Sequence, residues 1–216
     1  MEEKIEVDNL IFEFVYELAL RDAVMRTAYL GDKSELRKCK EAKNIVRQYA
    51  DDIIDGKFFD YDGYYKIAAD LCNSFNPYIK VPEDSKNKNP QFTFGNAQKL
   101  LNMTIKYLYI MCYKNSNVRE CFKKCHCPMD GIMIDKVINE LKDLKKIGDA
   151  QVQEHTKRGY IGFLKSKSWS RLSFRDDKAI YEQFQKSVKF LADKQGLSPL
   201  EYDYYLWNKK EGATAD

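Results

Sequence analysis

Apolar residues recur at steps of three and four along most of this 216-residue chain, which is the period of an amphipathic helix. Glycine (10 residues) and proline (5 residues) are scarce, whereas short strands joined by tight turns would need many more of both. The pattern therefore predicts an all-α protein and argues against an all-β fold. Between residues 3 and 30, the apolar positions at helical spacing are Leu10, Ile11, Phe14, Val15, Leu18, Val24, Met25 and Tyr29.

Glycine and proline also mark the expected ends of the helices. Gly31 should end the first helix, and Ser34 should cap a second helix that runs to about Ile54. A third helix, from about Asp62, should end at Asn76-Pro77, because the residue before a proline is pushed out of the helical region. Later helices are expected over residues 93–113, 117–125, 130–145, 177–195 and 199–207.

Two of these later helices carry N-terminal signals. Asp177 is expected to cap the first of the two, and Ser198-Pro199-Leu200-Glu201 is a capping box with proline at the first helical position. A polar connection over residues 76–92 separates the first three helices from the rest. We therefore expect a single compact unit over residues 1–216, in which two lobes, 1–76 and 90–208, are joined by a linker at 77–89 and enclose a cleft.

The composition is that of a soluble globular protein, with 44% hydrophobic and 32% charged residues. The net charge of +3 is too small to identify a polyanionic partner, but its distribution is uneven. Residues 1–60 carry 10 basic and 14 acidic side chains, so the basic excess lies entirely in the remainder. No secretory signal and no stretch of 18 apolar residues is present, and six cysteines without a signal are expected to be free thiols. We expect a cytoplasmic protein with no membrane partner.

The helix expected at 93–113 is mostly apolar, yet Lys99, Asn102, Lys106 and Tyr109 lie on one of its faces. An ammonium group beside an apolar helix is costly unless it reaches solvent, pairs with an acid or has a chemical role. A lysine partly removed from water can act as an amine nucleophile. A solvent-exposed lysine stripe gives the same spacing, so this observation alone leaves both interpretations open.

A second cluster, His126-Cys127-Pro128-Met129-Asp130, comes directly before an apolar helix. Asp130 is well placed to cap that helix, where a carboxylate satisfies free backbone N–H groups and complements the helix dipole. A capping aspartate is also held rigidly and kept ionised. The capping role and a catalytic role are therefore compatible.

Gln98-Lys99, with Lys106 seven residues later and Pro128-Met129-Asp130 before a helix, resembles the helix-hairpin-helix DNA glycosylase superfamily. Within it, the spacing of 31 residues from Lys99 to Asp130 is most similar to the archaeal 8-oxoguanine glycosylase branch. Trp169-Ser170 and the segment from Ser198 to Trp207 resemble the ending of that branch. The resemblance covers about residues 93–208.

The resemblance implies a two-lobed helical enzyme that excises a damaged or modified base from duplex DNA, as a monomer and without a cofactor or a metal. Lys99 would attack the sugar C1′, with Lys106 as the second candidate nucleophile. Asp130 would stabilise the cationic sugar or assist proton transfer. The extruded base would be held by Trp207, Phe94 and Asn102.

Basic and aromatic residues alternate between positions 157 and 175, in a stretch rich in serine and glycine. This composition suits phosphate contacts next to stacking platforms, although it also fits a solvated loop anchored by its aromatic side chains. The residues expected to bind nucleic acid are Lys157, Arg158, Lys165, Lys167, Trp169, Arg171 and Arg175.

Three alternatives compete with the glycosylase interpretation. Cys121, Cys125, His126 and Cys127 offer four soft ligands in seven residues, but adjacent histidine and cysteine chelate poorly, so no metal site is predicted. Arg119 and His126 are similar to the Arg-x4–6-His motif of HEPN ribonucleases, which are also small helical proteins. A non-catalytic helical binding protein would use Lys99 and Asp130 only for pairing and capping.

Overall fold

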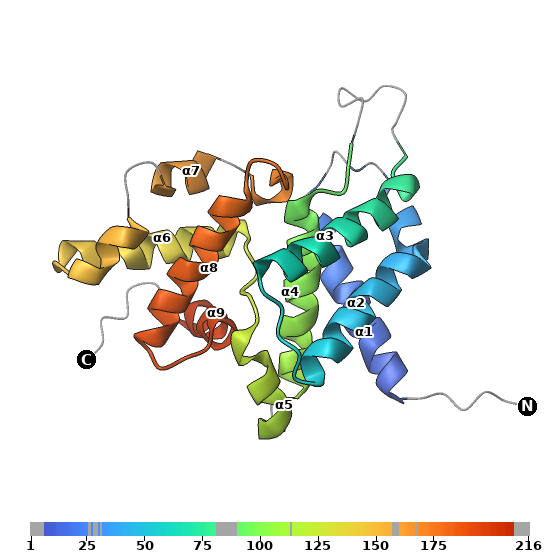
Figure 1. The fold of residues 1–216 in the computed structure, drawn as a ribbon, viewed down its shortest axis with the longest axis horizontal. Coiled ribbons are helices and arrows are strands. Elements are labelled where there is room, and N and C mark those ends of the chain that lie inside the picture. Colours follow the sequence, from blue (N-terminus) through green and yellow to red (C-terminus); the bar gives the residue numbers. More distant parts are fainter. Residues whose placement is uncertain are drawn as a thin grey trace, which may run out of the picture.

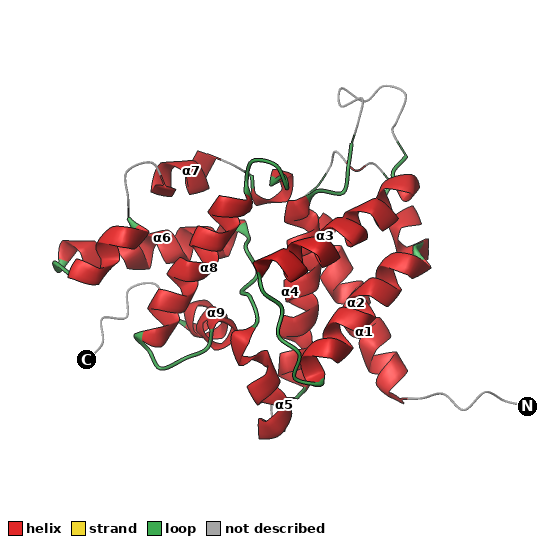
Figure 2. Ribbon diagram, in the orientation of Figure 1, coloured by secondary structure: helices red, strands yellow, loops and turns green. Residues whose placement is uncertain are grey.

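The computed structural model describes residues 7–25, 27, 30, 32–80, 90–112, 114–156, 160–166 and 168–209 (Figure 1). These residues form helices and loops, with no strand among them (Figure 2), which confirms the all-α class. The α-helices are α1 (Val7–Val24), α2 (Lys40–Ile54), α3 (Tyr61–Phe75), α4 (Phe94–Met111), α5 (Ser116–Cys121), α6 (Gly131–Lys146), α7 (Tyr160–Ser166), α8 (Lys178–Asp193) and α9 (Pro199–Asn208). Short 3-10 helices are η2 (Glu35–Lys38), η3 (Asn76–Tyr78), η4 (Phe122–Lys124), η5 (Ala150–His155) and η6 (Trp169–Arg171).

No helix in the described part of the chain is both long enough and apolar enough to cross a membrane. Figure 1 shows α4 between two groups of helices, with α1, α2 and α3 on one side and α6–α9 on the other. α4 packs most extensively against α1 and also contacts α2 and α3, whereas α6, α8 and α9 pack against one another. The central helix, which the sequence analysis assigns to the second lobe, is thus largely covered by the N-terminal helices.

The apolar positions at helical spacing do not all face the core. Leu10, Ile11, Phe14 and Met25 are exposed, and Tyr29 lies outside the described residues. Because apolar residues occur on both sides of α1, the period predicts a helix without selecting its inner face. Val15 and Val24 are buried, and the rest of the inner face comprises Phe12, Tyr16, Ala19, Leu20 and Ala23.

Local capping explains where most helices begin, with two corrections. Ser198 and Glu201 form the expected capping box of α9, and Asp130 caps α6. Asp177 makes no capping bond to α8, because its carboxylate accepts from the backbone N–H of Ser173 upstream (2.7 Å). Ser34 does not cap α2 either, because η2 intervenes and the Cys39 thiol accepts the capping bond instead.

A close backbone contact at Gly95 joins α4 to η6. The Gly95 N–H donates to the carbonyl of Leu172 (3.2 Å), and the Thr93 hydroxyl donates to the carbonyl of Ser170 (2.6 Å). A Cβ atom on Gly95 would lie 1.9 Å from the carbonyl oxygen of Trp169, so no larger residue fits without moving η6. This contact fixes the backbone of Trp169 one helical turn from Lys99.

We expect Gly95→Ala to lower the free energy of unfolding by about 1–3 kcal/mol, as overpacking against backbone does. Equilibrium unfolding in urea measures this change. Gly131→Ala is the matched control, because nothing lies within 4 Å of a Cβ atom at that helix start. Equal stability of Gly95→Ala and wild type would mean that η6 can move away at no cost.

Candidate active site

A cavity of about 300 Å³ opens where α1, α4, α6, η6 and α9 meet. This volume is at the lower end of the range for ligand pockets. The structure brings five of the predicted site residues to this cavity: Lys99, Lys106, Asp130, Trp169 and Trp207. The remaining lining residues are Asp22, Met25, Met103, Tyr107, Gly131 and Ile132.

Lys99 and Asp130 are in direct contact inside the cavity. The Lys99 ammonium donates to Oδ2 of Asp130, while Oδ1 of the same carboxylate accepts the α6 capping bond from the N–H of Met133 (2.9 Å). Lys99 is only 6% exposed, and its Nζ lies 5.7 Å from the ring centroid of Trp169. The ion pair and the aromatic ring together offset the cost of keeping this ammonium group out of water.

Lys106, two helical turns after Lys99, pairs with a different acid. Its Nζ lies 2.6 Å from Oδ2 of Asp203 on α9, a residue with no exposed surface. Burial raises the pKa of Asp203, and the charge of Lys106 opposes that effect. The Lys106 ammonium also lies 5.2 Å from the ring of Tyr204 and 5.7 Å from that of Trp207.

The mouth of the cavity is apolar and open to solvent. Trp207, Met25 and Ile132 line it and are 51%, 58% and 38% exposed, respectively. Exposed large apolar side chains around a pocket are typical of a binding surface. The cavity therefore combines charged pairs on α4 with an apolar rim.

Two of the residues expected to bind a base do not line this cavity. Phe94 is buried in the core, where its ring packs against those of Tyr65 and Tyr181. Asn102 is also buried: its amide donates to the hydroxyl of Tyr181 (3.0 Å), and its Oδ1 accepts from the hydroxyl of Tyr64 (3.0 Å). Asn102 lies on the same face of α4 as Lys99, but Tyr64 of α3 and Tyr181 of α8 cover it.

Asp203 is the functional candidate that the sequence analysis missed. It lies one helical turn before Trp207 on α9, and it faces Lys106. A spacing of four between an acid and the predicted stacking residue was the available signal. The signal is weak because acidic residues are common on helices.

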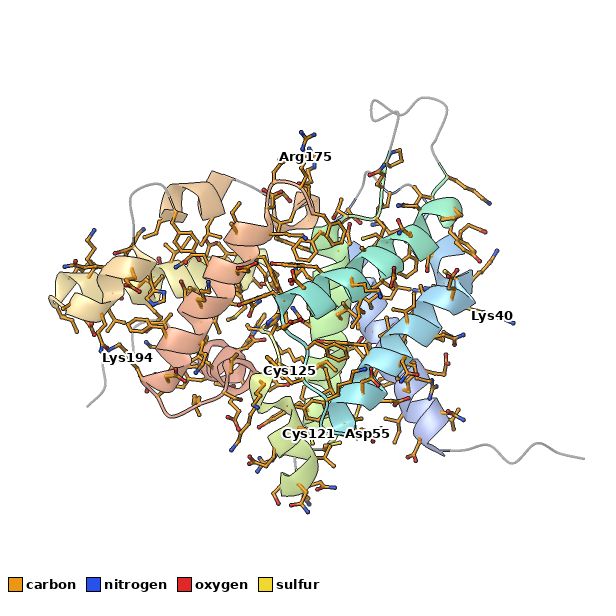
Figure 3. The ribbon with its side chains drawn as sticks, viewed as in Figure 1. Lys40, Asp55, Cys121, Cys125, Arg175 and Lys194 are labelled. Carbon is orange, nitrogen blue, oxygen red and sulfur yellow. The ribbon has the colours of Figure 1, made fainter. Side chains whose placement is uncertain are left out.

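Only part of the predicted nucleic-acid segment can be placed. Trp169 lines the cavity, whereas Arg171 and Arg175 are exposed, and Figure 3 shows Arg175 pointing outward at the edge of the molecule. Lys165 belongs to α7, but its side chain is outside the described part. Lys157, Arg158 and Lys167 lie outside the described residues.

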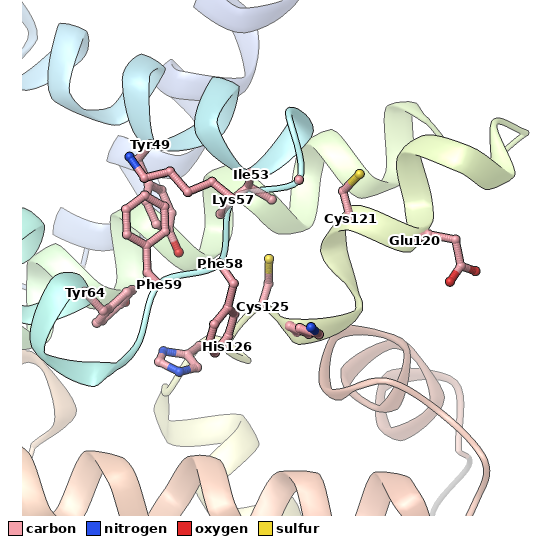
Figure 4. Close-up of a pocket in the computed structure, with 12 residues that line it drawn as sticks. Tyr49, Ile53, Lys57, Phe58, Phe59, Tyr64, Glu120, Cys121, Cys125 and His126 are labelled. Carbon is pink, nitrogen blue, oxygen red and sulfur yellow. The ribbon is translucent and has the colours of Figure 1, made fainter.

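Arg119 and His126, the proposed HEPN pair, belong to different clusters. Arg119 lies near Tyr109: burial raises the pKa of Tyr109 to about 12, and the charge of Arg119 opposes that effect. The Tyr109 hydroxyl donates to Glu201 (2.7 Å). His126 packs against Tyr61, Tyr64 and Tyr181, and it lines a second cavity of about 140 Å³ with Phe58 and Phe59 (Figure 4). The described residues include no group of three His, Cys, Asp or Glu side chains that could hold a metal ion.

Burial among these rings lowers the pKa of His126 to about 4. A histidine whose pKa is depressed in the folded state contributes stability above pH 6.5, and that stability is lost as pH falls toward 4. We expect His126→Phe to lose less stability than wild type between pH 7.5 and pH 5, by about 2 kcal/mol. Urea unfolding at the two pH values measures the difference. An unchanged slope for His126→Phe would contradict the prediction.

Comparison of the chain with protein-family models, curated proteins and solved structures finds no match. The geometry of the cavity and the chemistry of its side chains are therefore what indicate a function for this chain.

Proposed function

We propose that the protein is a DNA glycosylase with lyase activity, which excises a damaged or modified base through Lys99 and Asp130. The observation that carries the proposal is the direct contact between the Lys99 ammonium and the Asp130 carboxylate inside an open cavity. An amine nucleophile beside a proton acceptor is the arrangement that covalent catalysis at a sugar carbon requires.

The first step follows from this pair. Lys99 transfers a proton to Asp130 and, as a neutral amine, forms a bond to C1′ while the bond between C1′ and the base nitrogen breaks. The base leaves with the bonding electrons and takes up a proton, for which the protonated Asp130 is the nearest donor. As this proton moves to the base, Asp130 becomes a carboxylate again and stabilises the positive charge that develops on the sugar.

Strand cleavage is the second step. Opening of the sugar ring converts the bond between Lys99 and C1′ into a protonated Schiff base. Loss of a proton from C2′ then expels the 3′ phosphate by β-elimination, and water releases the lysine. No redox change occurs, so this scheme needs no oxidant, reductant or organic cofactor.

Lys99 fits the nucleophile role better than Lys106. The partner of Lys99 lines the cavity and has a 17% exposed side chain, so both members of the pair can meet a sugar. The partner of Lys106 is Asp203, which is fully buried, so the ion pair holds the Lys106 ammonium against α9 at the side of the cavity. Lys106 is therefore suited to contact a base edge rather than C1′.

The apolar rim fits an extruded nucleotide. The C1′ atom of a stacked nucleotide is inaccessible, so a glycosylase must rotate the nucleotide into a pocket. Trp207 offers a half-exposed ring on which a base can stack. The exposed Arg171 and Arg175 follow the pocket residue Trp169 in the chain, where cationic side chains can contact phosphates.

Borohydride trapping tests this function. The protein is incubated with duplex oligonucleotides that carry an abasic site or one of a panel of oxidised and alkylated bases, and sodium borohydride is added. The expected result is a covalent protein–DNA adduct with the abasic duplex and with at least one lesion, together with strand cleavage when borohydride is left out. Absence of any adduct with the abasic duplex would overturn the proposal.

A further inference from the structure

The segment before Asp130 is held by two buried glutamines. Gln98 on α4 donates from Nε2 to the carbonyl of Met129 (2.8 Å) and accepts from its N–H at Oε1 (3.1 Å). Gln185 on α8 pairs in the same two-way manner with Cys127, at 2.7 Å and 2.9 Å. Both side chains are almost completely buried, with 0% and 4% exposure.

Each side-chain amide both donates to and accepts from one residue's backbone, as a neighbouring strand would in a sheet. The segment between η4 and α6 is not helical, so its buried N–H and C=O groups need partners elsewhere. Removing Gln98 leaves the N–H and C=O groups of Met129 unsatisfied, whereas removing Gln185 leaves the Cys127 N–H unsatisfied, because the Cys127 carbonyl still accepts from Asn102 (3.3 Å). Each glutamine with its two backbone hydrogen bonds therefore forms a clamp, which fixes the position of the residue that it holds.

The two clamps differ in their distance from the proposed chemistry. Gln98 holds Met129, the residue directly before Asp130, whereas Gln185 holds a residue three positions before it. Gln98 also directly precedes Lys99 on α4. Of these two adjacent residues, Gln98 holds the backbone of Met129 and Lys99 pairs with the carboxylate of Asp130.

We infer that Gln98 is a positioning residue, which sets the Asp130 carboxylate against Lys99 through the backbone of Met129. This inference rests on the proposed function for its catalytic consequence. Gln185, by contrast, mainly stabilises the segment. Comparing variants of the two glutamines therefore separates a loss of stability from a misplacement of the Asp130 carboxylate.

The first test compares Gln98→Met with Gln185→Met. Both should lower the melting temperature, because each leaves a buried backbone N–H group unpaired. Single-turnover cleavage of abasic DNA should fall about 100-fold in Gln98→Met with little change in DNA affinity, as expected for a small misplacement of a reacting group. Gln185→Met should stay within about fivefold of wild type. Equal rate losses in the two variants would overturn the inference.

Gln98→Glu gives a second readout that a general loss of stability would not produce. A carboxylate at this position accepts from the Met129 N–H but cannot donate to its carbonyl, whereas a protonated carboxyl does both. The ratio of the Gln98→Glu rate to the wild-type rate should therefore rise as pH falls from 8 to 5. A ratio independent of pH would contradict the inference.

Hydrogen exchange measured by NMR separates this inference from the proposed function. In Gln98→Met the N–H groups of Met129 and Met133 should exchange faster, because the second is bonded to Asp130, while that of Leu141 within α6 stays protected. If this pattern appears in a protein that forms no adduct with DNA, the clamp stands and the proposed function fails. Unchanged exchange at Met133 would overturn the clamp whatever the activity.

Discussion

Replacement of Lys99 with arginine should abolish adduct formation and reduce strand cleavage at abasic sites by at least about a thousand-fold. Arginine keeps the positive charge and can still pair with Asp130, but its guanidinium stays protonated and cannot form a Schiff base. Folding and DNA affinity should therefore stay near those of wild type. Borohydride trapping and a single-turnover gel assay measure the loss.

The same variant discriminates between the proposed glycosylase activity and a non-catalytic role for Lys99. If Lys99 only pairs with Asp130, which caps α6, then Lys99→Arg preserves its role and every measured property stays the same. Lys99→Met, which removes the charge, supplies the matched comparison for stability. Wild-type cleavage by Lys99→Arg would exclude Lys99 as the nucleophile.

Replacement of Lys106 with methionine should lower the free energy of unfolding at pH 7.5 by about 3–5 kcal/mol, the usual cost of leaving one member of a buried ion pair. Asp203 has no exposed surface, so water cannot replace the missing ammonium. Urea unfolding measures the loss. The double variant Lys106→Met with Asp203→Leu should recover most of it, because removing both charges leaves nothing unpaired.

The cost of Lys106→Met should also depend on pH. Burial already raises the pKa of Asp203 in the wild type, and loss of Lys106 raises it further. A carboxyl whose pKa is raised on folding stabilises the folded state at low pH, and this contribution is lost as pH rises through the folded value. The variant should therefore be closest to wild type in acid and least stable above neutrality. A cost that does not change with pH would mean that water reaches Asp203.

The sequence predicts the fold class well because helical period is a local property that each segment carries by itself. It does not select the buried face of α1, since Leu10 and Phe14 on one side are as apolar as Phe12 and Tyr16 on the other. That choice depends on the contact with α4, which is about 70 residues away in the chain. Asp177 shows the same limit: a capping residue by type, it instead bonds to Ser173.

In the candidate site too, local spacing predicts some residues, and others are identified only by contacts in the folded chain. Spacing on one helix places Lys99 and Lys106 on a shared face. The pairing of Lys99 with Asp130, 31 positions later in the sequence, is suggested by the family resemblance rather than by a local pattern. Asn102 lies on that face too, but side chains from α3 and α8 cover it. Asp203 was missed because only the folded chain shows that it faces Lys106.

In the proposed mechanism, Lys99 is the residue that becomes bonded to the sugar. The direct measurement is peptide mapping by mass spectrometry of the borohydride-reduced adduct formed with an abasic-site oligonucleotide. We expect the sugar-derived mass on the peptide that contains Lys99, with Lys106 unmodified. An adduct on Lys106 or on any other lysine, or no adduct at all, would contradict the claim.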